Sequence, residues 1–303
     1  MIGGGKQKEE KMSFVFAEKY KASWSETERL DIHCDTRIVK ESISGAHFSA
    51  KQRSFIEQYG IVKSTIIAPE ICISFAGNDI LYATKLFRKL YDRHSFSRQD
   101  VVSLAYEIHQ SAPNDAIEFI ISSFEDGKLQ IDSIKEGGIC EDCPSAWIGS
   151  QVAFSAFQEE RLNTYPKGKP IHEYTYGAFS NVVAGCGDSS VGGFHIVVTY
   201  HSDNQTFCFQ ESKRLYALDQ IVKLGEAVIF DTSRESGGYS CEIISPSIEY
   251  LLFVIDQMKP AILFSRQHRC AEDSTNKSLF SLMLPMVIMV IMQNENGAWN
   301  RCY

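Results

Sequence analysis

The segment of residues 61–78, IVKSTIIAPEICISFAGN, restricts the fold more than any other part of the chain. It contains two short blocks rich in β-branched residues, 64–67 and 71–75, and the Ala-Pro-Glu between them predicts a tight β-hairpin. Residues 79–91 follow with apolar side chains at helical spacing, which predicts an amphipathic helix. Lys63 is therefore expected at the head of the hairpin, either as a catalytic group or as a solvated charge at a strand end.

The chain up to about residue 210 alternates strand-like and helix-like patterns. Helices are predicted at residues 79–91, at 97–110 and directly after Ser150. This order predicts an α+β protein in which helices cover two packed, mainly antiparallel sheets. The predicted strands are residues 13–20, 30–39, 64–67, 71–75, 117–122, 129–134, 146–149, 192–200 and 205–210. Residues 13–20 and 30–39 are predicted to form a first hairpin, and residues 117–122 and 129–134 another one around Asp126 and Gly127.

Composition argues against several classes of protein. A chain of 303 residues with 44% hydrophobic residues can bury a substantial core. Its formal net charge is -8 and no Lys/Arg cluster is long enough to follow a phosphate backbone, so no nucleic-acid partner is predicted. The apolar segment 279–292 is too short to span a bilayer, so no membrane partner is predicted. Nine scattered cysteines without a signal peptide predict free thiols and a cytoplasmic location.

The sequence predicts no metal and no other cofactor. Cys140 and Cys143 are the one close cysteine pair, but no second pair or histidine stands at the spacing of a zinc site. A loop with two thiols is therefore favoured over a metal site. No ligand motif surrounds His33, His47 or His195, and these are predicted to be core or surface histidines.

The two ends of the chain differ from its middle. Residues 1–12 have no apolar periodicity, and residues 8–11 resemble a translated ribosome-binding sequence, so the segment is either a disordered tail or a mis-assigned start. Loss of Met12 would leave Ser13 with a free α-amino group; otherwise Ser13 is an ordinary strand residue. Residues 211–278 are predicted to complete or extend the main domain, and within them residues 250–255 are predicted to form either a strand or a helix. For the apolar tail 279–303, a buried element, an interface patch and a frameshifted segment are all left open.

Five local blocks along residues 13–210 carry a resemblance to a known family. Their order and register are similar to those of the proteasome β-subunit and HslV group of N-terminal nucleophile (Ntn) hydrolases. The resemblance implies a four-layer αββα sandwich, in which two packed, mainly antiparallel sheets are flanked by helices. The blocks are HCDTRI, a loop with Gly45 and Ala46, VKSTIIAPEICISFAGN, AWIGSQVAFSAF and GDSSVGGFHIVV.

The resemblance implies a hydrolase that cleaves amide bonds in peptide or protein substrates. In such enzymes the first residue of the mature chain attacks the carbonyl carbon while its own α-amine takes the proton, a role that falls to Ser13. Asp35 and Lys63 match a catalytic carboxylate and lysine, which together lower the pKa of the nucleophile's hydroxyl. Gly77 matches the glycine whose backbone N–H points at the oxyanion. The alternatives are a surface salt bridge for the charged pair and a simple turn for the glycine.

Two further residues match the outer part of such a site. Ser150 and Asp188 resemble the serine and aspartate that support the terminal amine, and their alternatives are a helix N-cap and a turn residue. Val191 stands where the family usually has a serine, and the links around the second strand are longer than usual. These departures leave a catalytically inactive proteasome-like subunit, or a binding and assembly module, as the alternative to a peptidase. Because relatives assemble into rings, the resemblance implies a homo-oligomer.

Overall fold

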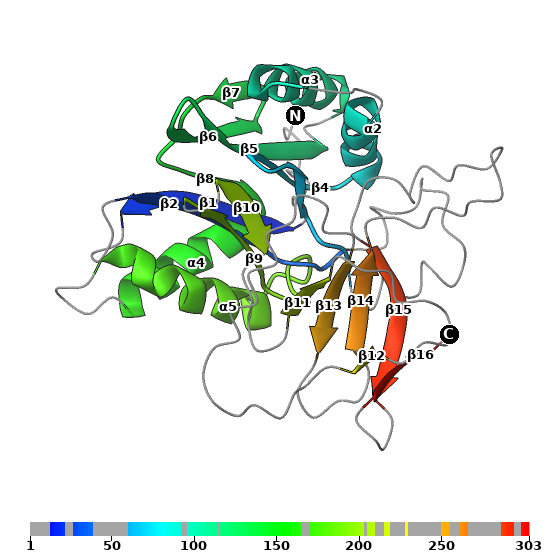
Figure 1. Ribbon diagram of the computed structural model, residues 1–303. Coiled ribbons are helices and arrows are strands. Elements are labelled where there is room, and N and C mark those ends of the chain that lie inside the picture. The colour runs from blue at the N-terminus through cyan, green and yellow to red at the C-terminus, as the bar shows by residue number, and fades with distance from the viewer. Residues whose placement is uncertain are drawn as a thin grey trace, which may run out of the picture.

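The computed structural model describes seven segments of the chain and the strands of one further sheet. Within this part of the chain the protein is α+β, with four α-helices and three sheets whose neighbouring strands are all antiparallel (Figure 1). The predictions for residues 1–12, for the loop with Gly45 and for His47 lie outside the described residues. The seven segments are residues 13–21, 27–38, 60–91, 96–113, 116–164, 170–202 and 205–209, and the additional strands fall within residues 215–302.

One five-stranded sheet begins with the first described residues. It has the order β10-β9-β2-β1-β8, built from β1 (Phe14–Lys21), β2 (Glu28–Cys34), β8 (Ser145–Gly149), β9 (Ile196–His201) and β10 (Thr206–Phe209). The predicted hairpin of β1 and β2 is confirmed, with Val15 opposite Cys34. The prediction that Asp35 lies on this second strand is wrong, because β2 ends at Cys34. Asp35 directly follows the strand, and its carboxylate accepts the N–H of Arg37 two residues further along the chain.

A second five-stranded sheet contains the hairpin predicted from residues 61–78. It has the order β3-β4-β5-β6-β7, built from β3 (Ser64–Ala68), β4 (Ile71–Gly77), β5 (Ile117–Glu125), β6 (Lys128–Lys135) and β7 (Gly138–Cys140). Ser64 lies opposite Ser74 across β3 and β4, which confirms the hairpin. β5 and β6 form the second predicted hairpin, whose turn contains Asp126 and Gly127, both with positive φ.

Four α-helices accompany these two sheets in the described segments. They are α2 (Ile80–Tyr91), α3 (Arg98–Ser111), α4 (Gln151–Thr164) and α5 (Thr175–Gly185). Asp79 accepts the N–H of Leu81 at the start of α2, and Ser97 and Asp100 form a capping box at the start of α3. Each cap satisfies N–H groups that have no acceptor within the first turn of the helix. The helices predicted over residues 79–91 and 97–110 are therefore confirmed.

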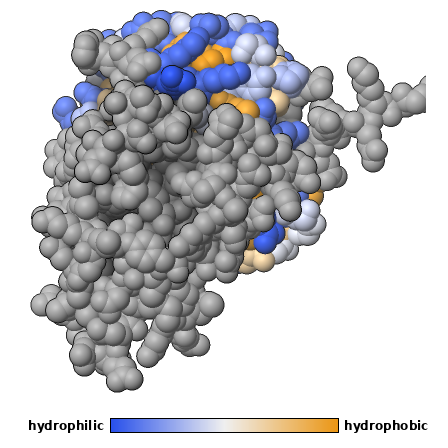
Figure 2. All heavy atoms as spheres, turned by 90° about the vertical axis from the view of Figure 1, so that its right-hand side faces the viewer, coloured by the Kyte–Doolittle hydropathy of each residue, from blue (hydrophilic) through white to orange (hydrophobic). Residues whose placement is uncertain are grey.

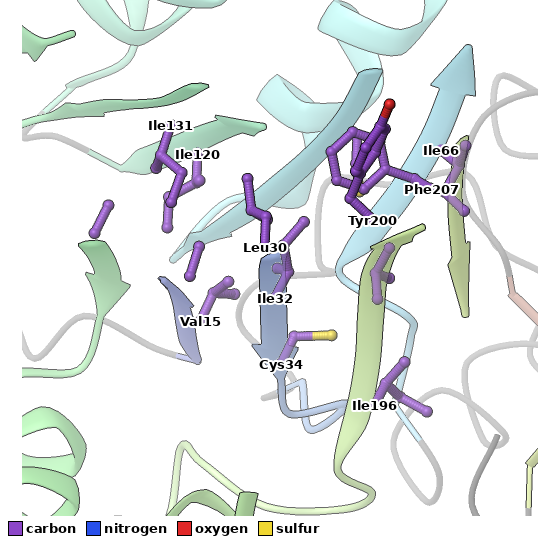
Figure 3. Packing of buried hydrophobic residues seen from close by; sticks show 14 of the residues in the cluster. Val15, Leu30, Ile32, Cys34, Ile66, Ile120, Ile131, Ile196, Tyr200 and Phe207 are labelled. Atoms are coloured by element: carbon purple, nitrogen blue, oxygen red, sulfur yellow. The ribbon is translucent and has the colours of Figure 1, made fainter. Parts of the chain in front are cut away.

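In the described segments, three hydrophobic clusters pack the sheets and helices together. The first lies between the two five-stranded sheets and includes Val15, Ile32 and Ile120 (Figure 3). The second joins β4 and β5 to α2 and α3, and the third joins β1 to α4 and α5. Successive residues of β1 point to opposite faces, so Val15 belongs to the first cluster and Phe14 to the third. Figure 1 accordingly shows one pair of helices beside each sheet.

The strands beyond residue 210 pair with one another in a third sheet. Its order is β11-β13-β14-β15-β16-β12. The sequence left residues 250–255 open between strand and helix, and the structure has a strand at Tyr250–Val254. The six strands are β11 (Leu215–Leu218), β12 (Val228–Ile229), β13 (Tyr250–Val254), β14 (Ala261–Ser265), β15 (Met286–Gln293) and β16 (Ala298–Cys302).

The outer face of α2 is polar, as expected for an amphipathic helix. Lys85, Arg88 and Lys89 are exposed, whereas Ala83 and Leu86 are buried. Figure 2 shows the molecule from the right-hand side of Figure 1. At the end where α2 and α3 lie, the described residues form a mainly hydrophilic surface around a small hydrophobic patch. No helix in the described segments has the length and apolar character needed to cross a membrane.

Candidate active site

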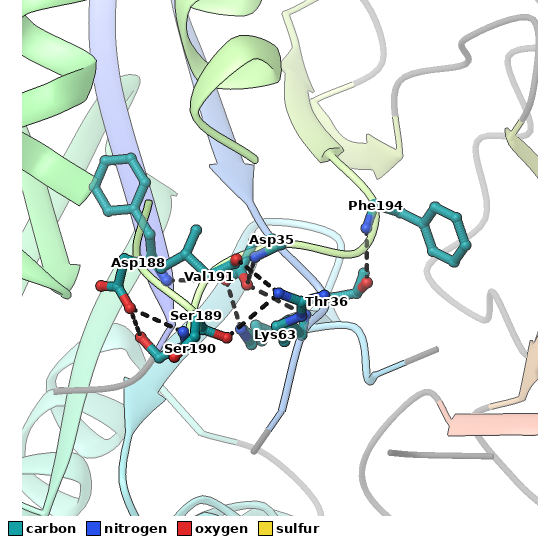
Figure 4. A network of polar contacts seen from close by, with 11 residues as sticks. Asp35, Thr36, Lys63, Asp188, Ser189, Ser190, Val191 and Phe194 are labelled. Carbon is teal, nitrogen blue, oxygen red and sulfur yellow. Dashed lines mark hydrogen bonds and ion pairs between the residues drawn. The ribbon is translucent and has the colours of Figure 1, made fainter. Parts of the chain in front are cut away.

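Asp35 lies at the centre of a buried polar network just beyond β2 (Figure 4). Its Oδ1 accepts hydrogen bonds from Nζ of Lys63 at 2.5 Å and from the N–H of Phe14 at 2.9 Å. Its Oδ2 accepts the N–H groups of Gly192 at 3.1 Å and Arg37 at 3.2 Å. Donors from four parts of the chain thus converge on one carboxylate, and charge-assisted hydrogen bonds of this kind hold it in one orientation.

Lys63 is buried directly before β3, where the sequence predicts it. Its side chain is 1% exposed and that of Asp35 is 0% exposed, so the alternative of a surface salt bridge is wrong. The carbonyl oxygen of Lys63 accepts the N–H of Phe75 at 3.0 Å, which anchors its backbone to β4. Burial raises the pKa of Asp35 and lowers the pKa of Lys63, while the attraction between the two groups opposes both shifts. Each group therefore depends on the other to stay charged.

Ser13 is connected to this pair through its peptide bond with Phe14. It precedes Phe14, whose N–H contacts Asp35, and its own carbonyl oxygen accepts the N–H of Ser150 at 2.7 Å. Ser13 is 4% exposed and has a φ of 84°, which residues other than glycine rarely adopt. β1 begins at Phe14, so Ser13 lies before the strand and not on it. In the intact chain its nitrogen belongs to the peptide bond with Met12, so an α-amine exists there only after residues 1–12 are removed.

Two glycines, Gly149 and Gly77, allow close approach of neighbouring backbone segments. Gly149 ends β8 with a φ of 96°, and a β carbon there would lie 2.1 Å from the carbonyl oxygen of Ser13 and 3.1 Å from Cβ of Ala76. Gly77 is the next residue after Ala76, and a β carbon there would lie 2.2 Å from the carbonyl oxygen of Ala116. Close backbone approach therefore requires glycine at both positions. The role of the Gly77 N–H as an oxyanion donor stays a prediction.

Ser150 and Asp188, which the sequence assigns to the outer part of the site, are in direct contact. The hydroxyl of Ser150 donates to Oδ2 of Asp188 and accepts the N–H of Ala153 at 3.0 Å, so Ser150 also caps α4. Ser190 donates to Oδ1 of Asp188 through its N–H at 2.8 Å and its hydroxyl at 2.6 Å. Burial acts to raise the pKa of Asp188, but these hydrogen bonds outweigh it and lower the pKa below its usual value.

Ser190 is a member of this network that sequence reasoning missed. Val191 stands where the family pattern expects a serine, and its side chain packs in the third hydrophobic cluster at 3% exposure. The hydroxyl of Ser190 reaches Asp188 instead. The only signal for this was the pair of serines that precedes Val191 in GDSSVGG. The same loop reaches Asp35 through the N–H of Gly192, so the two parts of the site share one loop.

His33 and His195 form a second polar contact, on the other side of β1 and β2 from the first cluster. Nδ1 of His33 lies 2.9 Å from Nε2 of His195, and the hydroxyl of Ser180 lies 2.8 Å from Nδ1 of His195. Both rings contact Phe179. Burial holds the pKa of His33 well below its usual range and lowers the pKa of His195 to about 3. In the described segments, no group of three or more His, Cys, Asp or Glu side chains is arranged to hold a metal ion.

Comparison with known proteins assigns the chain to no family. No protein-family model matches it, and no curated protein matches it either. The chemistry of the site is therefore inferred from its own geometry. That geometry brings Ser13, Asp35, Lys63, Ser150 and Asp188 into one connected network, through direct hydrogen bonds and the Ser13–Phe14 peptide unit.

Proposed function

We propose that this chain is an Ntn hydrolase resembling proteasome β-subunits, which cleaves peptide bonds with Ser13 as the nucleophile after residues 1–12 are removed. The observation that carries the proposal is the buried ion pair of Lys63 and Asp35, linked to Ser13 by the N–H of Phe14. A buried ion pair contributes little or nothing to stability compared with apolar residues of the same size. A pair of this kind beside a residue with a hydroxyl group therefore favours a functional role.

In the proposed reaction, the α-amine of the processed Ser13 takes the proton from its hydroxyl, and Oγ attacks the substrate carbonyl carbon. An α-amine titrates at about pH 8, so it acts as a base near neutral pH without a large shift. The ammonium of Lys63 stabilises the negative charge that develops on Oγ, and Asp35 keeps that ammonium charged and oriented. The amine then protonates the leaving nitrogen, and water hydrolyses the ester formed on Ser13.

The remaining predicted residues have supporting roles in this proposal. The N–H of Gly77 donates to the oxyanion, and Ser150 with Asp188 positions the terminal amine. Support for the second role comes from the hydrogen bond between the N–H of Ser150 and the carbonyl oxygen of Ser13. No cofactor takes part, because the nucleophile, the base and the cation all belong to the chain.

We also propose that the two five-stranded sheets and their helices form a four-layer αββα sandwich. Support comes from the three hydrophobic clusters, one between the sheets and one between each sheet and its helices. By the same resemblance, the substrates are peptides or proteins in the cytoplasm, and the chain assembles into a homo-oligomeric ring.

The first test is the N-terminal residue of the protein purified from its own host. Mass spectrometry should find Ser13 at the N-terminus, and a β-lactone probe should acylate its hydroxyl. Ser13→Ala and Lys63→Ala should abolish labelling and peptide hydrolysis. Lys89→Ala is the matched control and should keep both, because Lys89 is half-exposed on α2. Residues 1–12 still attached in the native protein, or labelling that persists in Ser13→Ala, would contradict the proposal.

The alternative is a catalytically inactive proteasome-like subunit or assembly module. Val191 favours it, because a buried apolar side chain replaces a hydroxyl that the family's network usually contains. This alternative predicts a folded, oligomeric protein that the β-lactone probe does not label even when Ser13 is N-terminal. Circular dichroism and size-exclusion chromatography on the same sample distinguish it from a protein that has failed to fold.

A further inference from the structure

Cys140 and Cys143 bring two free thiols together outside the Asp35 network. Their sulfur atoms lie 2.7 Å apart, and Sγ of Cys143 also lies 3.3 Å from the carbonyl oxygen of Cys140. Two thiols at this separation need only a small movement to become bonded to one another. Glu141 and Asp142 stand between the two cysteines in the spacing C-x-x-C, and the positive φ of Asp142, 47°, turns the chain so that the two side chains meet.

The two thiols differ in their access to solvent. Cys140 ends β7, which is the edge strand of its sheet, and is exposed. Cys143 is only 7% exposed, and its N–H donates to the carbonyl oxygen of Ile131 at 2.7 Å. Burial and the contact with Cys140 raise the pKa of the Cys143 thiol to about 12. One thiol is thus open to an external reagent while its neighbour is shielded, which is the arrangement of an attacking and a resolving cysteine.

The segment that carries both cysteines is anchored on each side. Lys19 on β1 forms an ion pair with Asp142 at 2.5 Å, and its N–H donates to the carbonyl oxygen of Pro144 at 2.9 Å. The N–H of Asp142 also donates to Oδ1 of Asp132 on β6 at 3.1 Å. After this segment the chain leaves one five-stranded sheet and enters the other as β8 (Figure 1). These contacts hold the two thiols together while both are reduced, so little conformational freedom is lost when they join.

We propose that Cys140 and Cys143 form a redox-active dithiol that is oxidised by small-molecule disulfides. The thiolate of Cys140 attacks one sulfur of the external disulfide, breaks its S–S bond and releases one thiolate, leaving a mixed disulfide on Cys140. Cys143 then loses its proton to solvent and attacks the Cys140 sulfur, which releases the second thiolate. The protein loses two hydrogens, and the external disulfide gains them as two thiols. The new bond between Cys140 and Cys143 cross-links the segment that connects the two sheets.

Oxidised glutathione is a suitable probe for the reduced, full-length protein. Both cysteines fall in one tryptic peptide, residues 136–161, which contains no other cysteine. After alkylation of the remaining thiols, mass spectrometry should find this peptide two hydrogens lighter than its unalkylated form. Cys143→Ser should accumulate glutathione on Cys140, and Cys140→Ser should leave Cys143 unmodified and alkylated only after unfolding. Cys186→Ser is the matched control, since Cys186 is partly exposed and lies outside this segment, and it should form the bond as the wild type does.

Two results would overturn the proposal. One is wild-type protein in which both thiols of peptide 136–161 stay reduced in excess oxidised glutathione. The other is a folded Cys143→Ser variant without a glutathione adduct on Cys140. If either serine variant does not fold, the glutathione released from the wild type tests the same reaction, because two molecules of glutathione must form for each internal bond. An internal bond that forms without this release would also contradict the proposal.

Discussion

Removal of either charge from the pair of Lys63 and Asp35 should strongly destabilise the protein. In Lys63→Met, Asp35 keeps its backbone donors but loses its counter-charge, and it can avoid a buried charge by taking up a proton. At pH 7 that uptake costs at most about 4 kcal/mol, because the usual pKa is 3.8. In Asp35→Asn, the buried ammonium can lose its proton at a cost of at most about 5 kcal/mol, because its usual pKa is 10.5. Both limits agree with the roughly 3–5 kcal/mol lost when one partner of a buried pair is removed.

The two variants should respond to pH in opposite directions. In Lys63→Met, the folded-state pKa of Asp35 is raised above its unfolded value, so the free energy of unfolding falls as the pH rises above that value. In Asp35→Asn, the folded-state pKa of Lys63 is lowered, so the free energy of unfolding rises as the pH approaches 10.5. Each response is limited to about 1.4 kcal/mol per pH unit, because one proton is involved.

Urea unfolding followed by circular dichroism, repeated at acid, neutral and alkaline pH, measures both effects. Lys89→Met is the matched control. Lys89 and Glu107 form an ion pair at 3.0 Å whose side chains are 50% and 67% exposed, so the substitution should cost less than about 1 kcal/mol. The double variant Lys63→Met/Asp35→Asn should lose less free energy of unfolding than the sum of the losses in the two single variants. The reasoning is refuted if Lys63→Met costs no more than Lys89→Met, or if both single variants respond to pH in the same direction.

Three further predictions concern other described contacts. His33 and His195 stay neutral in the folded protein but take up protons in the unfolded chain, so the free energy of unfolding should fall by about 3 kcal/mol from pH 7.5 to pH 5.5. The same fall in a variant with both histidines changed to Gln would disprove this. Gly149→Ala should cost about 2 kcal/mol or more, because its β carbon meets the carbonyl oxygen of Ser13, and a wild-type melting temperature would contradict the clash. Ser97→Ala should cost about 1 kcal/mol in urea unfolding through loss of the α3 cap, whereas an unchanged midpoint would show that α3 does not depend on it.

Short-range features of this protein follow from its sequence. The hairpin of β3 and β4 depends on two β-branched blocks joined by a turn at Pro69, and α3 begins where Ser97 and Asp100 cap each other. Contacts between residues this close in the chain cost little loop-closure entropy, so the hydrophobic periodicity and the turn residues are sufficient to predict them. The end of β2 was predicted wrongly because the position of Asp35 depends on a donor from a distant loop, the N–H of Gly192.

The identity of the candidate site residues came from the sequence, through a resemblance, but their contacts are decided by the tertiary structure. Lys63 and Asp35 are 28 residues apart, and Ser150 and Asp188 are 38 residues apart. His33 and His195, which are also in contact, are 162 residues apart, and no sequence motif predicted their contact. The contact exists because β9 pairs with β2 and aligns His33 with Val197. His195 directly precedes β9, so it lies close to His33. Periodicity in a sequence reports which face of a strand is buried, but the pairing of strands far apart in the chain determines which buried groups meet.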